Sequence, residues 1–155
     1  MVNGDELCRR LHRELIGQRI SFIRLACDML LLYVECNPGD GQGLTIWFNP
    51  PWRVSAPDGV IADSRQVRGD NDGPTEAELD RISEPIYEKL INQPITEVQV
   101  DQCSRNLTVT VAVAYDAKTC ASDLENDHLW HIRENATGLT LYATTTGWRV
   151  RVGKV

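Results

Sequence analysis

The stretch Leu15-Ile16-Gly17-Gln18-Arg19-Ile20 is echoed 75 residues later by Leu90-Ile91-Asn92-Gln93-Pro94-Ile95, and this pair of motifs decides the fold. Leucine and isoleucine residues at helical spacing precede each motif, and alternating apolar residues follow it. Gly17 stands where a left-handed residue commonly ends a helix. Since the interval is close to half of the 155 residues, the pattern predicts a duplicated unit that consists of a helix, a turn and a run of strands.

Apolar positions extend the match beyond the two motifs. A shift of 75 places Leu11 on Ile86, and a shift of 78 places Trp52 on Trp130. The shift drifts because loops differ slightly in length between the copies. A rival register that places Trp52 on Trp148 needs a long insertion, so the first register is preferred. Each unit alone would leave an apolar sheet face uncovered, and we expect the two to pack together around a pseudo-twofold axis.

Each unit is predicted to be a helix followed by an antiparallel β meander. Asn3 with Glu6, and Thr75 with Glu78, form capping boxes at the two helix starts. Pro85 is expected to kink or break the second helix two residues earlier, because proline removes a backbone donor. Strands are expected at about 19–27, 29–36, 44–48, 52–54 and 60–61 in the first unit and at about 95–102, 107–115, 129–133, 138–144 and 148–152 in the second.

The expected fold class is therefore α+β and β-rich, in a single domain that covers the whole chain. The first repeat spans about 3–64, a polar linker about 65–74 and the second repeat about 75–152. The segment 116–127 is acidic and irregular, and the third strand of the second repeat is expected to be degraded at 120–125. A composition of 42% apolar and 25% charged residues is that of a soluble globular protein.

Apolar runs and charge indicate the location and the class of partner. The longest apolar run, Met29 to Val34, is too short to span a bilayer, and residues 1–6 form no signal segment, so a cytoplasmic, non-membrane protein is expected. The net charge of −6 argues against nucleic-acid binding, which needs concentrated lysine and arginine, and is compatible with a basic protein partner. Five cysteines without a CxxC pair are expected to be free thiols.

No catalytic residue, metal site or cofactor is predicted. His128 and His131 are spaced by three on an expected strand, which places them on opposite faces and disfavours a metal pair. Cys120 with His128 would need a base within reach and a lowered thiol pKa, and no nucleophile motif surrounds it. Cys27 and Cys103 lie at equivalent hairpin turns, where either two free thiols or a disulfide across the axis would fit.

The predicted binding surface combines a tryptophan with acidic windows. Trp47 alternates with Ile46 and Phe48 and therefore faces away from them, either as an interface anchor or as cover for a helix or the other sheet. The windows 70–80 and 116–127 would attract a basic partner, or else form solvated loops and a helix N-terminus. The predicted partner-binding residues are Trp47, Asp70, Asp72, Glu76, Glu78, Asp123, Glu125 and Asp127.

The segment Pro51-Trp52-Arg53-Val54, followed by Gly59-Val60-Ile61, resembles a group of small uncharacterised bacterial proteins in which a PWRI-type segment joins two related β units. That group is similar in size and style to the immunity proteins of toxin systems. The resemblance implies a non-catalytic bacterial protein-binding module, an immunity protein whose partner is a basic toxin domain.

Two alternatives stay open beside this reading. One is a small-ligand-binding protein or enzyme with a pocket between the two repeats, lined by His128, His131 and Cys120. The other is a structural homo-oligomer, such as a homodimer, that assembles through sheet edges.

Overall fold

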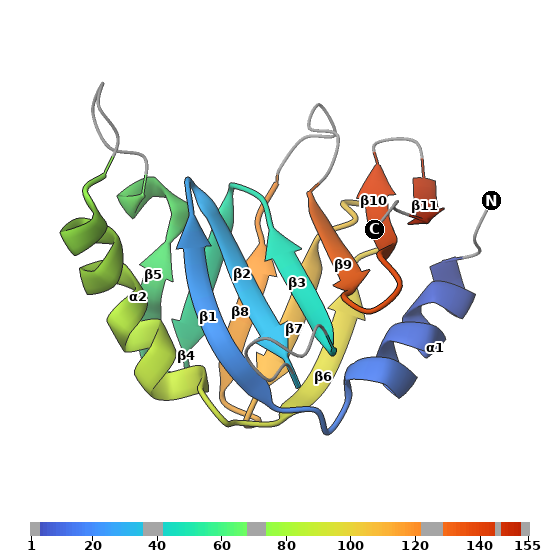
Figure 1. Ribbon diagram of the computed structural model, residues 1–155, viewed down its shortest axis with the longest axis horizontal. Helices are drawn as coiled ribbons and strands as arrows, with labels where there is room; N and C mark the ends of the chain where they lie inside the picture. Colours follow the sequence, from blue (N-terminus) through green and yellow to red (C-terminus); the bar gives the residue numbers. More distant parts are fainter. Residues whose placement is uncertain (1–3, 36–41, 68–73, 122–128, 145–146, 153–155) are drawn as a thin grey trace.

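The computed structural model describes residues 4–35, 42–67, 74–121, 129–144 and 147–152. The described residues form two antiparallel sheets that lie face to face, with an α-helix flanking each side (Figure 1). The fold is thus α+β and β-rich, as the sequence predicts. The elements are α1 (Gly4–Leu15), β1 (Ile20–Ala26), β2 (Met29–Val34), β3 (Leu44–Phe48), β4 (Trp52–Ala56), β5 (Gly59–Asp63), the 3-10 helix η1 (Ser64–Gln66), α2 (Glu76–Leu90), β6 (Ile95–Val100), β7 (Leu107–Val111), β8 (Tyr115–Thr119), β9 (Trp130–Glu134), β10 (Leu139–Thr144) and β11 (Gly147–Val152).

Each sheet contains strands from both repeats. The six-stranded sheet has the order β1-β2-β3-β9-β10-β11, so the meander of the first repeat is extended by strands of the second. The five-stranded sheet has the order β5-β4-β8-β7-β6, so the meander of the second repeat is extended by a hairpin of the first. The pairs β3–β9 and β4–β8 join the repeats at equivalent places. The two halves therefore exchange strands across the pseudo-twofold axis.

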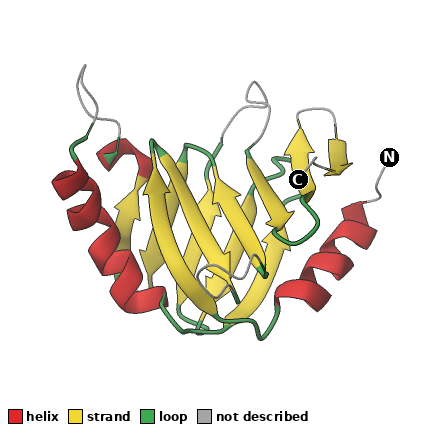
Figure 2. Ribbon diagram, in the orientation of Figure 1, coloured by secondary structure: helices red, strands yellow, loops and turns green. Residues whose placement is uncertain are grey.

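The helices are exchanged in the same way. Helix α1 of the first repeat packs against β6 of the second, and α2 of the second repeat packs against β1 and β5 of the first. Figure 2 shows both helices at the sides of the sandwich, not on top of either sheet. The buried residues form one shared core, and fully burying a leucine or isoleucine there contributes about 1.5–3 kcal/mol. The helical residues at its centre are Leu11, Leu15, Ile86 and Leu90, each at most 1% exposed.

The two motifs that predict the duplication bond to each other. The amide of Gly17 donates to the carbonyl of Ile95 at 2.8 Å, and the amide of Asn92 donates to the carbonyl of Ile20 at 2.7 Å. The two bonds are equivalent, because a shift of 75 residues places Gly17 on Asn92 and Ile20 on Ile95. This shift is the register found in the sequence. Gly17 and Asn92 both have positive φ, +85° and +60°, so each ends its helix in the left-handed conformation.

Two buried tryptophans confirm the register in the later part of each repeat. Trp52 and Trp130 are at most 1% exposed. The indole Nε1 of Trp52 donates to the carbonyl of Asp28, and that of Trp130 donates to the carbonyl of Arg105, both at 2.8 Å. The rival match between Trp52 and Trp148 is wrong, because Trp148 lies on β11, an added strand that follows the β9–β10 hairpin.

The expected break in the second helix is wrong. Helix α2 runs without interruption through Pro85. Pro85 is exposed, so the backbone carbonyl that it leaves without a helical donor lies on the solvent side, where water can bind it. The predicted cap is confirmed at Thr75, whose Oγ1 accepts from the amide of Glu78 at 3.2 Å.

The third strand of the second repeat is also misplaced in the sequence prediction. It is β8 and precedes the segment 120–125, in which a degraded strand was expected. Alternation from Leu107 to Tyr115 hides the turn between β7 and β8, because Ala112 and Val113 occupy it with φ of +52° and +65°. Such positions normally carry glycine, asparagine or aspartate, so this turn gives no sequence signal.

Candidate functional site

Trp47 lies on the outer face of the six-stranded sheet, as predicted. Its neighbours Ile46 and Phe48 are fully buried on the inner face. The indole of Trp47 is partly exposed and stacks on the imidazole of His131, with ring centroids 4.9 Å apart and planes at 23°. Its Nε1 is buried and has no hydrogen-bond partner within the described ranges. Residues of this outer row lie directly opposite one another from strand to strand: Arg24, Leu31, Trp47, His131 and Tyr142.

The other predicted partner-binding residues are placed only in part. Glu76 and Glu78 are exposed in the first turn of α2, where the positive end of the helix dipole stabilises negatively charged carboxylates. The remaining predicted acids lie outside the described residues: Asp70, Asp72, Asp123, Glu125 and Asp127.

Helix α2 carries a row of acidic residues that extends beyond the predicted acidic window 70–80. Glu76, Asp80, Glu84 and Glu88 recur at four-residue spacing, and all four are exposed. Residues four apart lie on the same side of a helix, so the row continues the predicted acidic window along the whole helix. Among the ion pairs within the described ranges, none includes these carboxylates. Tyr87, 44% exposed, lies beside them.

The five-stranded sheet has its own outer row at the equivalent positions. Gln99, Thr108, Lys118 and Arg53 lie directly opposite one another across β6, β7, β8 and β4. Lys118 corresponds to Trp47 in place, and Arg53 corresponds to His131. The same backbone thus presents an aromatic pair on one sheet and two cations on the other.

An open groove of about 780 Å³ runs along this second row. Its walls come from α1 and β4 of the first repeat and from β6, β7 and β8 of the second, so it is a pocket between the repeats. Cys120 lines it, as the ligand-binding alternative expects. His131 does not, because it stacks on Trp47 on the other sheet, and His128 lies outside the described residues.

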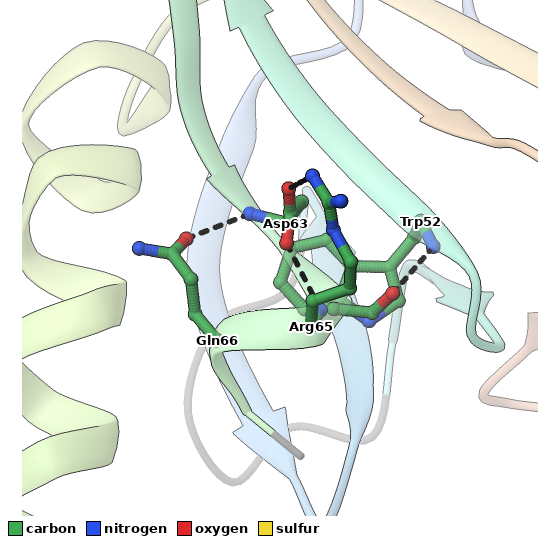
Figure 3. A network of polar contacts seen from close by, with 5 residues as sticks. Trp52, Asp63, Arg65 and Gln66 are labelled. Carbon is green, nitrogen blue, oxygen red and sulfur yellow. Dashed lines mark hydrogen bonds and ion pairs between the residues drawn. The ribbon is translucent and has the colours of Figure 1, made fainter. Parts of the chain in front are cut away.

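Among the described residues Arg53 has no ion-pair partner, although its register would suggest one. Asp63 lies directly opposite it on β5. The carboxylate of Asp63, however, accepts from the guanidinium and the amide of Arg65, each at 2.9 Å (Figure 3). The hydrogen bond from the Arg65 side chain holds the pKa of Asp63 below its ordinary value. The hydroxyl of Ser64 accepts from the amide of Trp52 at 3.1 Å, which ties the 3-10 helix to the start of β4.

Four of the five cysteines lie within the described residues, and all four are free thiols. Cys27 and Cys103 are free and exposed in the β1–β2 and β6–β7 turns. Burial, followed by the nearby charge of Asp5, raises the pKa of the Cys8 thiol. Within the described ranges, no group of three or more histidine, cysteine, aspartate or glutamate side chains could hold a metal ion. No helix among the described residues is long and apolar enough to cross a membrane.

Comparison with protein-family models, with curated proteins and with solved structures finds no match to this chain. Its function is therefore inferred from its own geometry and charge.

Proposed function

We propose that this protein is a non-catalytic binding module that presents the acidic row of α2 to a basic protein, as a bacterial immunity protein neutralising a toxin domain would. The observation that carries the proposal is the four-residue repeat of Glu76, Asp80, Glu84 and Glu88 on an exposed helix without ion pairs among the described residues.

Such a row works against the stability of the isolated helix. Like charges four residues apart each destabilise a helix by about 0.2–0.5 kcal/mol, and the row contains three such pairs. A surface of this kind gains from a partner of opposite charge, because complementary potentials speed diffusional encounter and exclude wrong partners. The net charge of −6 adds to the attraction of a basic protein.

Aromatic side chains near the row supply anchors for an interface. Tyr87 is 44% exposed on α2 itself. Trp47 lies on the outer face of the sheet whose edge strand, β1, packs against α2. Two strand spacings, about 10 Å, separate β1 from β3, so one partner surface of ordinary size can reach both. Tyrosine and tryptophan are the residues that most often dominate binding energy at such contacts.

The proposal is tested with the purified full chain against the purified products of the genes that flank its own, among which a basic protein is the expected partner. In Glu84→Lys, the association rate should fall about tenfold at low salt and its salt dependence should weaken, because steering depends on this charge. Asp58→Lys, an equal charge change in the exposed β4–β5 turn, is the matched control and should change the rate little. An absence of any complex at micromolar concentration, or equal rates for the two variants, would refute the proposal.

A further inference from the structure

The groove beside α1 combines polar walls with two cations and lies apart from the acidic row of α2. Its volume of about 780 Å³ is that of a small-molecule site. Most of its lining is polar, which suits a hydrophilic ligand better than an apolar one. The side chains that matter for recognition are His12, Arg53, Gln99, Thr108 and Lys118.

The two cations at the centre of the groove lie directly opposite each other on β4 and β8. Like charges in this position repel and weaken the strand pair. Among the described residues, neither Asp63 nor Asp116 forms an ion pair with Arg53 or Lys118. Asp63 is bound by Arg65, and Asp116, two residues before Lys118, accepts from the Thr110 hydroxyl at 2.8 Å. A third carboxylate, Asp101, also lines the groove, and its Oδ1 accepts from the amides of Cys103 and Ser104 in the β6–β7 turn. The centre of the groove is thus cationic in a protein whose net charge is −6.

The Nε of Arg53 is buried and has no hydrogen-bond partner in the described part of the chain. Buried polar groups in folded proteins are nearly always hydrogen-bonded, so this N–H favours a position of the guanidinium in which an acceptor can reach it. Guanidinium groups bind the two oxygens of a carboxylate or phosphate through parallel hydrogen bonds, and a lysine ammonium beside them adds a point charge.

Comparison of the two repeats shows that strand pairing does not require these cations. Trp47 and His131 occupy the equivalent places on the six-stranded sheet and pair in the same register. The fold therefore accepts an aromatic pair where the second row has Lys118 and Arg53. Their presence in the groove needs another explanation, and an anionic ligand provides one.

We infer that Arg53 and Lys118 bind the oxyanion group, a phosphate or a carboxylate, of a small polar molecule. Thr108 and Gln99 continue the row and offer a hydroxyl and an amide to the rest of the ligand. On the α1 side the imidazole of His12 faces Glu97 at 3.3 Å, which holds its ring at the rim of the groove. The site is independent of the α2 surface, so either proposal can fail without the other.

The test is a titration of the full chain with inorganic phosphate, pyrophosphate and citrate at constant ionic strength, followed by amide chemical shifts. Saturable shifts should occur at β4, β7 and β8. Arg53→Gln and Lys118→Gln should each weaken binding by about tenfold. Arg24→Gln is the matched control, because Arg24 belongs to the equivalent row of the other sheet, and should leave the affinity unchanged.

Preference for pyrophosphate would assign a phosphorylated ligand, and preference for citrate would assign a carboxylate. Circular dichroism establishes that each variant is folded, and Lys118→Gln carries the test if Arg53→Gln does not fold. No saturable binding at about 10 mM of any of the three anions, or wild-type affinity in the folded variants, would overturn the inference.

Discussion

Trp52 and Trp130 offer a direct test of the pseudo-twofold fold. Both indoles are buried, and each donates a 2.8 Å hydrogen bond to a turn carbonyl of the meander in the same repeat. Replacing either one by phenylalanine removes the N–H donor and leaves part of the indole volume empty. Because the two sites are equivalent, Trp52→Phe and Trp130→Phe should destabilise the protein by similar amounts.

The expected magnitude follows from two contributions. Both hydrogen bonds are partly buried, and a carbonyl that loses its donor in such a place costs about 1–3 kcal/mol. The space left by the smaller ring adds about 1 kcal/mol, well below the cost of complete truncation to alanine. Each substitution should therefore lower the free energy of unfolding by about 2–4 kcal/mol, which corresponds to a fall in Tm of about 10 °C for a chain of this size.

The assay is urea unfolding of the wild type and the two variants, followed by circular dichroism because each variant loses a fluorescent indole. The m-value should stay constant, since the surface exposed on unfolding hardly changes. A difference of more than about 2 kcal/mol between the two variants would refute the equivalence of the sites. A neutral effect of both would refute the role given to the indole hydrogen bonds.

Three further results are expected. Glu84→Lys should raise the free energy of unfolding by about 0.5 kcal/mol at low salt in urea titrations, because it removes repulsion from both acidic neighbours, and the gain should vanish in high salt. Asp63 has a lowered pKa in the folded protein, so its carboxylate stabilises the fold fully above the unfolded pKa. This stabilisation is lost as the pH falls through the folded pKa. The free energy of unfolding between about pH 5 and pH 2 should therefore depend less on pH in Asp63→Asn than in the wild type. Iodoacetamide should label Cys27 and Cys103 faster than Cys8, whose thiol pKa burial raises, and mass spectrometry of timed digests would contradict this if Cys8 reacted first.

The sequence predicts most of the architecture because the duplication is visible in local patterns. The motifs around Gly17 and Asn92 each carry a helix end and a strand start, and these features depend on neighbouring residues alone. The outward direction of Trp47 follows from strand alternation in the same way. Such local rules give the number and type of most elements and the faces of their side chains.

Long-range features could not be predicted in the same way. The turn at Ala112 and Val113 lacks the usual residues, so β8 was hidden within an apparently continuous strand. The pairing of Arg53 with Lys118 joins residues far apart in the sequence and depends on the exchange of β4 into the sheet of the second repeat. The sequence predicts only the first half of the acidic row of α2, because Pro85 favours an interrupted helix whereas the helix continues to Leu90.

The placement of β4 and β5 beside β8, and of β9 and β10 beside β3, bears on the ancestry of the chain. A polypeptide that contained only one repeat could complete both sheets only by forming a homodimer, so its folding would depend on protein concentration. Gene fusion of two copies makes that association intramolecular and releases the halves from the requirement to remain identical. The face with Trp47 and His131 and the face with Lys118 and Arg53 then derive from one ancestral surface. Mutations could make them different only after the fusion.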